Sequence, residues 1–340
     1  MNSEDQVDRK RPRIEYEREA AAAAAARRAE VDNPYTNHPT LYMDDGNIIM
    51  KCTSSTTLFR VHRSILSKHS TVLDALFKTA ASQQPPNKLR ECLFVEMADD
   101  KDDLAGLLVA IYDGIHVTVP EELTVETFPS FAGLLRVTTK YKIERVRQLL
   151  INRLHEEWPS ALDKHDAKVA AFSTRYLAQQ NMDDTIVHPA SVIALLHDCA
   201  YTPPDLMGPL FYDLSKRTWQ FGGDAAGHHL APLTPSDMEK FIVGMTKIRS
   251  AHVKSTEAPL HVITKPTCKA ALLPEWLRRV YATLYRSNNY MCTPMEDWSA
   301  FLVILKASPP WVCRDCHTLL IKHCERMRQD LWKTVLTSFT

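Results

Sequence analysis

The residues with the clearest chemical potential lie together near the C-terminal end of the sequence. Cys313 and Cys316 are spaced Cys-x-x-Cys, His317 follows directly, and His323 and Cys324 come later in the same segment. Thiols and imidazoles are the ligands that zinc prefers, and a Cys-x-x-Cys pair can also act as a redox dithiol. The Cys-x-x-Cys-His pattern matches covalent haem attachment as well, but the N-terminal sequence lacks the export or mitochondrial context that this chemistry needs.

Helical spacing gives these cysteines a second interpretation. One stripe of a helix would carry several apolar and thiol side chains, namely Cys316, Leu319, Leu320, His323, Cys324, Met327 and Leu331. Cysteine on such a stripe behaves as a small hydrophobic residue, and Cys316 and His323 would lie roughly 10 Å apart along the helix axis. We therefore expect core packing here and no cofactor. A zinc site drawn from Cys313, Cys316, His317, His323 and Cys324, or a redox dithiol, is the alternative.

Motifs for catalysis are absent from the rest of the chain. Neither G-x-G-x-x-G, G-x-x-x-x-G-K-[ST] nor G-x-S-x-G occurs. The stretch that begins at His155 starts like H-E-x-x-H but has Pro159 in place of the second histidine. The acidic run Asp99–Asp103 contains no turn glycine of a calcium loop and is typical of a helix N-terminus. The sequence predicts a non-enzymatic protein with no catalytic or cofactor-binding residue.

Charge and composition limit the classes of partner. The 340 residues include 41 Lys plus Arg and 41 Asp plus Glu, so the net charge is zero and no overall field favours nucleic acid or a membrane surface. No apolar stretch approaches the roughly 20 residues that span a bilayer, and no secretory signal precedes the globular part. We expect an intracellular protein, in the cytoplasm, the nucleus or both, whose eight cysteines are thiols.

An α+β pattern occupies residues 34–158. Alternating apolar residues predict strands at Asn47–Cys52, Leu58–Val61 and Cys92–Met97, the first two joined as a hairpin after Asp44-Asp45-Gly46. Helical spacing predicts three helices in this part of the chain. The first covers 62–68, the second begins after Ser70 as its N-cap, and the third runs from Leu104 to Tyr112. The candidate core of this small sheet and its helices consists of Val61, His62, Ile65, Leu66, Leu73, Leu76, Phe77, Leu107, Leu108 and Tyr112.

Residues 159–340 are predicted to be entirely helical and to end in a long helix. Helix starts carry Ser, Thr, Asp or Pro, as expected for caps and first turns. The expected segments are 166–179, 189–200, 205–219, 235–250, 267–286, 295–306 and 314–339. Residues 1–33 form an Ala- and Arg-rich arm of low complexity, which has too few large apolar residues to form a core.

The order of these elements resembles the BTB (POZ) domain. The resemblance is carried by D-D-G-N-I-I-M at 44–50, L-F-R-V-H-R-S-I-L-S-K-H-S at 58–70, V-E-M-A-D-D at 95–100, L-L-V-A-I-Y-D-G at 107–114 and L-L-R-V-T-T-K-Y-K-I-E-R-V-R at 134–147. It is closest to the large group of BTB proteins of mushroom-forming fungi. In that group a helical region follows and ends in Cys-x-x-Cys plus a long helix, as at 313–332 here.

The resemblance implies a protein-interaction module that dimerises or recruits a protein partner, without chemistry and without direct contact to nucleic acid. It also implies that His62 is buried near a helix start, where one ring nitrogen needs a backbone partner. The strand-exchanged dimer of this family uses an extra N-terminal strand. Pro34 and Pro39 make Val31–Met43 a poor candidate for that strand.

Two alternative functions remain open at this point. The basic residues Arg9, Lys10, Arg11 and Arg13 form a cluster of the kind that nuclear import receptors read, which would suit a nuclear transcription or chromatin regulator recruited through the BTB surface. Some BTB proteins are substrate adaptors of cullin-type ubiquitin ligases and carry an apolar-x-acidic motif after the helix that ends near Phe77. The corresponding stretch here, 78–83, lacks it.

Overall fold

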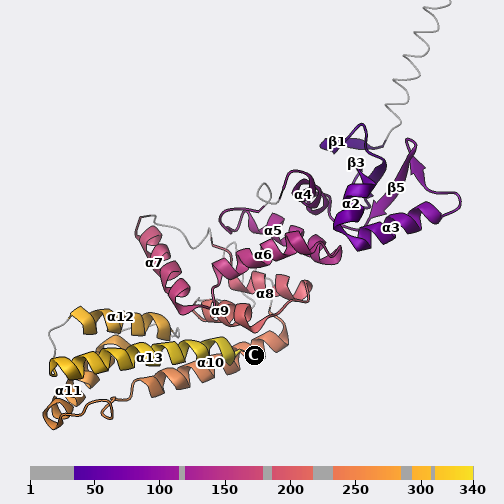
Figure 1. Cartoon of the computed structure of the whole chain (residues 1–340). Coiled ribbons are helices and arrows are strands. Elements are labelled where there is room, and N and C mark those ends of the chain that lie inside the picture. Colours follow the sequence, from indigo (N-terminus) through magenta and orange to yellow (C-terminus); the bar gives the residue numbers. More distant parts are fainter. Residues whose placement is uncertain are drawn as a thin grey trace, which may run out of the picture. The chain divides into compact units, whose positions relative to one another are not determined.

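The computed structural model describes residues 34–114, 119–178, 186–216, 233–284, 293–307 and 311–339. The chain divides into two compact units, which are described separately below (Figure 1). The first unit takes residues up to Thr118 together with Val137–Glu144, and the second takes Val119–Arg136 and Arg145–Thr340. A small mixed sheet with helices is thus followed by a helical region, as the sequence predicts at this coarse level.

A five-stranded sheet forms the centre of the first unit. Its strand order is β1-β3-β2-β5-β4. The antiparallel β2–β3 hairpin confirms the prediction, and β2 also pairs in parallel with β5. The strands are β1 (Thr36–Tyr42), β2 (Ile48–Cys52), β3 (Thr57–Val61), β4 (Lys88–Leu89) and β5 (Cys92–Met97). Because side chains alternate along each strand, Met50 and its neighbours Phe59 and Val95 share one face, where all three are buried.

The expectation that the N-terminal segment is a poor strand is wrong from Thr36 onward. Thr36–Tyr42 forms β1, which pairs in parallel with β3 at one edge of the sheet. The pairing register shifts between Asn37 and Tyr42, the stretch that contains Pro39. An edge strand has hydrogen-bonding partners on one side only, so a proline costs it little there, and this explains why the strand tolerates Pro39.

Two short helices, α2 (Arg63–His69) and α3 (Thr71–Ser82), follow the hairpin, and α3 packs against β5 (Figure 1). Ser70 is the N-cap of α3, as predicted: its hydroxyl accepts the Leu73 N–H at 3.0 Å and donates to the Tyr141 carbonyl at 2.5 Å. This buried serine therefore joins the helix pair to the segment around Tyr141 within the same unit.

The predicted acidic helix start is also present. Asp100 caps α4 (Lys101–Tyr112), and its carboxylate accepts the N–H groups of Asp102 and Asp103. The side chain of Asp99, only 6% exposed, pairs with Lys140 at 2.6 Å and accepts the Tyr141 hydroxyl proton. These carboxylates thus have structural partners.

Six of the ten predicted core residues are buried, three are half-buried and one is exposed. Val61, Leu66, Leu73, Phe77, Leu107 and Leu108 are all buried, whereas His62, Ile65 and Tyr112 are half-buried. Leu76 is 36% exposed, so its assignment to the core is wrong. Leu73 and Phe77 are four residues apart and share one face of α3, while Leu76 is about 100° around the helix from Phe77 and reaches its solvent-facing margin.

The second unit consists of helices. The predicted long helix is present, and the other helices from 189 onward begin within about two residues of the predicted starts. Their bounds are α5 (Phe128–Lys140, whose last residues belong to the first unit), α6 (Glu144–Glu157), α7 (Leu162–Ala178), α8 (Pro189–Asp198), α9 (Pro204–Ser215), α10 (Pro235–Ser255), α11 (Pro266–Leu284), α12 (Pro294–Ala307) and α13 (Arg314–Ser338).

Helix α13 is the central packing element of this unit and contacts α9, α10 and α12 (Figure 1). Two glycines permit the closest approaches. A Cβ atom on Gly208 of α9 would lie 2.7 Å from the Leu336 carbonyl oxygen, and one on Gly244 of α10 would overlap the Phe339 ring. These positions therefore set how near α13 comes to its neighbours.

The division between the units falls earlier than the sequence boundary at 158. Most of α6 belongs to the second unit, where Arg153 bonds the Glu121 carbonyl and Lys168 bonds Glu157. Trp158 donates its indole N–H to Asp213 at 3.1 Å. Periodicity identifies the buried face of a helix but does not identify what covers it, so the sequence pattern could not assign α6. Among the described helices, none has the length and apolar character needed to cross a membrane.

Candidate functional site

His62 sits where β3 leads into α2, as the resemblance implies, but its ring partners are side chains. Its backbone N–H donates to the Tyr112 hydroxyl at 2.9 Å, and its Nδ1 lies 3.1 Å from the same oxygen. Its Nε2 lies 3.1 Å from a carboxylate oxygen of Asp45. The expected backbone partner of the ring is therefore wrong, because the turn before β2 and the end of α4 each supply a side chain instead.

One protonation pattern satisfies every group of this contact. The Tyr112 oxygen accepts the His62 N–H and donates its own proton to Nδ1, while Nε2–H donates to Asp45. The hydrogen bond from His62 lowers the pKa of the exposed Asp45 carboxyl from its ordinary value. The contact holds the hairpin, the start of α2 and the end of α4 together, and we interpret it as structural.

The sheet face opposite Met50, Phe59 and Val95 carries a distinct set of side chains, which we call the outer sheet face. At its base, Ile49, Leu58 and Cys92 form a buried cluster. Partly exposed residues pack over this cluster from β1, β4, β5 and their flanks: Tyr35, Tyr42, Leu89 and Phe94. The face is therefore apolar beneath and aromatic at its surface.

Cations border these aromatic rings. The guanidinium of Arg90 donates to the Tyr42 hydroxyl at 2.7 Å and to the Asn37 side-chain oxygen at 2.8 Å. Arg60 and Arg90 lie 5.9 and 5.5 Å from the centroid of the Tyr42 ring, and Lys51 lies 5.9 Å from that of Tyr35. Stacked cations of this kind stabilise the aromatic rings in fixed positions.

The turn that presents Arg90 has an uncommon backbone. Arg90 and Glu91 connect β4 to β5 with φ values of 49° and 65°. Positive φ at both central residues of a two-residue hairpin is the pattern that usually selects Asn-Gly. Non-glycine residues there cost on the order of 1 kcal/mol each. This turn could not be predicted, because the loop that contains Pro85 and Pro86 gives no signal for the two-residue strand β4.

The structure brings two of the five predicted zinc candidates together with a third cysteine and places the other three elsewhere. Cys313 is the N-cap of α13 and Cys316 lies in its first turn, and their sulfur atoms meet that of Cys268 from the first turn of α11. All three lie within 4.8 Å of one another. We refer to them as the thiol cluster. Cys268 was not predicted as a member, because it lies 45 residues before Cys313. Its position at the start of a predicted helix is the one sequence feature that it shares with Cys313.

The other three zinc candidates lie outside the thiol cluster. His317 has its Nε2 at 3.0 Å from the Leu305 carbonyl oxygen, and the His323 ring packs against His261. Cys324 is fully buried, and burial raises the pKa of its thiol to about 12, as expected for a core cysteine. The described cysteines are all free thiols, in agreement with the prediction.

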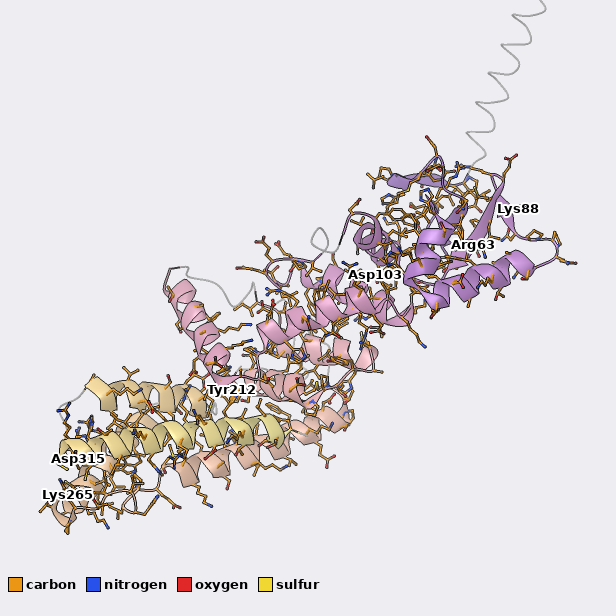
Figure 2. All side chains as sticks on the ribbon, viewed as in Figure 1. Arg63, Lys88, Asp103, Tyr212, Lys265 and Asp315 are labelled. Carbon is orange, nitrogen blue, oxygen red and sulfur yellow. The ribbon has the colours of Figure 1, made fainter. Side chains whose placement is uncertain are left out.

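Electrostatics distinguish the members of the thiol cluster. The Cys316 N–H donates to the Cys313 sulfur, and together with the neighbouring thiols and Lys265 it lowers the pKa of Cys313 to about 7. Burial raises the pKa of Cys316. Lys265 and Asp315, labelled in Figure 2, form an ion pair at 3.6 Å beside the cluster.

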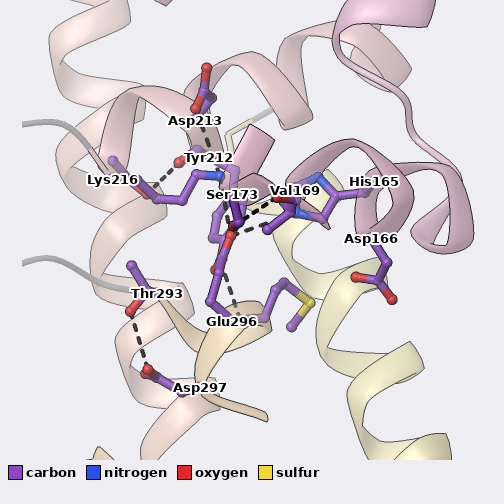
Figure 3. A network of polar contacts seen from close by, with 12 residues as sticks. His165, Asp166, Val169, Ser173, Tyr212, Asp213, Lys216, Thr293, Glu296 and Asp297 are labelled. Atoms are coloured by element: carbon purple, nitrogen blue, oxygen red, sulfur yellow. Dashed lines mark hydrogen bonds and ion pairs between the residues drawn. The ribbon is translucent and has the colours of Figure 1, made fainter. Parts of the chain in front are cut away.

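A partly buried charge network inside the second unit was not predicted from the sequence (Figure 3). Glu296 of α12 accepts the Tyr212 hydroxyl proton at 2.5 Å and the Lys216 ammonium at 3.2 Å, and the His165 ring lies 3.7 Å away. Burial alone would raise the pKa of Glu296, but His165, Lys216 and Tyr212 together hold it well below its ordinary value. A carboxylate of such low basicity is a poor general base.

A cavity of about 170 Å³ borders this network and is lined by His165, Asp166, Val169, Ala170, Met295, Glu296, Ser299 and Arg328. Arg328 spans it with two hydrogen bonds to Asp166, at 2.7 and 2.5 Å, and a third to the Met295 carbonyl. Its charged groups are already paired with each other, so we interpret the network as a structural joint between α7, α9, α12 and α13.

Neither family models, curated proteins nor solved structures show a match to this chain. The functional interpretation therefore depends on the geometry of these sites. Within the described part of the first unit, the outer sheet face combines partly exposed aromatic side chains with bordering cations. The basic cluster Arg9–Arg13 lies outside the described residues.

Proposed function

We propose that the first unit is a BTB (POZ)-type interaction module that acts by self-association, without a catalytic step. The order of its elements supports this: a β2–β3 hairpin, the α2–α3 pair, a strand β5 parallel to β2, and then α4. This is the order that the resemblance implies. The observation that carries the proposal is the outer sheet face with its bordering edge strand β1.

The composition of this face supports binding to another protein. Tyrosine and arginine are enriched among the residues that dominate interface energies. Tyr42 and Arg90 are held together by a hydrogen bond and by stacking, so little side-chain entropy remains to be lost on binding. The energetic cost of the turn at Arg90 and Glu91 is consistent with a functional role, because strain of this kind is concentrated at binding sites.

A second copy of the chain is the partner that this face suits best. It carries the cations Lys51, Arg60 and Arg90 and the carboxylate of Glu96, which pairs with Lys51 at 3.1 Å. Two copies related by a two-fold axis can place opposite charges against each other from one identical surface. The aromatic centre then becomes buried between them.

Light scattering of the full chain tests this proposal. We expect a mass of twice 38.7 kDa for the native protein. Phe94→Arg and Arg90→Glu, which alter the aromatic centre and the exposed edge of the face, should return the mass to that of one chain. Leu277→Arg is the matched control: this leucine is 57% exposed on α11 of the second unit, so the dimer should persist. A native protein with the mass of a single chain, or a dimer unaffected by both variants, contradicts the proposal.

The two alternative functions have less support. The α3 residues after Phe77 are mostly exposed and are polar or alanine, so a cullin adaptor would lack an apolar anchor there. A nuclear regulator rests on the basic cluster Arg9–Arg13 alone. Alanine substitution of that cluster, followed by imaging of the tagged chain, tests it: an unchanged distribution contradicts nuclear import through these residues.

A further inference from the structure

We propose that the thiol cluster Cys268, Cys313 and Cys316 binds one zinc ion, with water in the fourth position. The three cysteines come from the N-terminal ends of two helices, α11 and α13, which the sequence places far apart. A zinc ion here would fasten these two helix ends together. This inference concerns the second unit and is independent of the proposed function.

The geometry is close to that of a thiolate site. Zinc–sulfur bonds of about 2.3 Å in tetrahedral coordination place the sulfur atoms about 3.8 Å apart. The sulfur atoms of the cluster lie within 4.8 Å of one another, so a movement of about 1 Å brings them to bonding positions. Cys268 and Cys316 are 7% and 1% exposed and Cys313 is half-buried, so the cluster has one accessible side for a water ligand.

Hydrogen bonding to sulfur distinguishes this cluster from ordinary core packing. The Cys313 N–H donates to the Cys268 sulfur at 3.4 Å. A thiol that acts as a small hydrophobic residue needs no such donor, whereas a thiolate ligand is stabilised by one.

The charge balance is consistent with zinc. Binding of Zn²⁺ to three thiols releases three protons and leaves a site of net charge −1. Lys265, three residues before Cys268 in the sequence, is the cation that would offset this charge, and it pairs with the exposed Asp315 at 3.6 Å. A disulfide between Cys313 and Cys316 would instead leave the buried Cys268 thiol without a role. The meeting of three sulfur atoms therefore favours a bound metal ion over a disulfide. Thiolate ligands select zinc over hard cations such as Mg²⁺.

Elemental analysis of the full chain, purified without chelators and under reducing conditions, tests the proposal. We expect about one zinc per chain in the native protein, and a loss of most of it in Cys313→Ala. Cys324→Ala is the control, because Cys324 lies on the same helix but outside the cluster, so its zinc content should stay at the native level. A native protein that retains no zinc after incubation with zinc salt, one that holds iron or copper instead, or a Cys313→Ala variant that keeps its zinc overturns the proposal.

A second measurement uses the native protein and does not depend on the folding of a variant. Alkylation at Cys313, located by peptide mass spectrometry, should be slow with zinc bound and at least tenfold faster after chelation. Equal labelling in both states overturns the proposal. So does a Cys313–Cys316 disulfide, seen as an intact mass lower by the two hydrogen atoms lost on oxidation, in protein prepared with zinc and reductant.

Discussion

Truncation of Phe77 to alanine is expected to destabilise the first unit strongly. Phe77 is completely buried on α3, the helix that packs against β5. Removal of a buried phenylalanine ring costs about 3–5 kcal/mol, because apolar contacts are lost and the surroundings close the resulting cavity only in part. The free energy of unfolding of this unit should fall by that amount.

The neighbouring residue provides the control. Leu76 is 36% exposed on the same helix, so Leu76→Ala removes few buried contacts and should cost about 1 kcal/mol or less. The equilibrium constant for opening should therefore increase by roughly a hundredfold to a few thousandfold in Phe77→Ala. In Leu76→Ala it should increase by less than about tenfold.

Amide hydrogen exchange is the suitable assay. All six tryptophans of the sequence fall within the chain ranges of the second unit, so tryptophan fluorescence does not report on the first. Peptides covering β2 and β3 report opening of the sheet directly by mass spectrometry. If Phe77→Ala accelerates their exchange less than tenfold, or if Leu76→Ala accelerates it equally, the reasoning from burial is refuted.

Three further predictions concern polar groups. Tyr112→Phe leaves the His62 N–H without its acceptor, so the first unit should lose about 1–3 kcal/mol, measured by exchange at that amide. Ser70→Ala removes both the α3 N-cap and the bond to the Tyr141 carbonyl; a loss of about 1–2 kcal/mol is expected, and Ser70→Thr should recover most of it. Burial raises the pKa of Asp297 from 3.8 to about 6, so the folded state binds a proton more tightly and the second unit loses stability as pH rises through that range. Asp297→Asn should abolish this loss in tryptophan-monitored denaturation, and an unchanged pH profile would contradict the assignment.

Local patterns were sufficient to predict most elements of this fold. Thr234 and Pro235 mark the start of α10, Ser70 caps α3 as expected, and the acidic run Asp99–Asp103 lies at a helix N-terminus as expected. Each of these signals depends on a few adjacent residues, because caps and first turns are satisfied by nearby side chains. The same holds for the β2–β3 hairpin, whose turn and strands are contiguous.

Contacts between residues that lie far apart in the sequence could not be predicted in this way. Tyr112 lies 50 residues from His62, and Cys268 lies 45 residues from Cys313, so no local pattern connects either pair. The thiol cluster in particular required knowledge of how α11 and α13 are arranged. Sequence reasoning identified two of its three members and added three residues that pack elsewhere.

The close approach at Gly244 has a consequence for how this chain can change over evolutionary time. Its neighbours Ile242 and Val243 are 59% and 44% exposed on the same helix, whereas a Cβ atom on Gly244 would overlap the Phe339 ring. A saturation library should recover nearly every amino acid at 242 and 243 but only glycine at 244. Descendants of this sequence can therefore diverge widely in overall sequence identity while a single invariant glycine preserves the spacing of their helices.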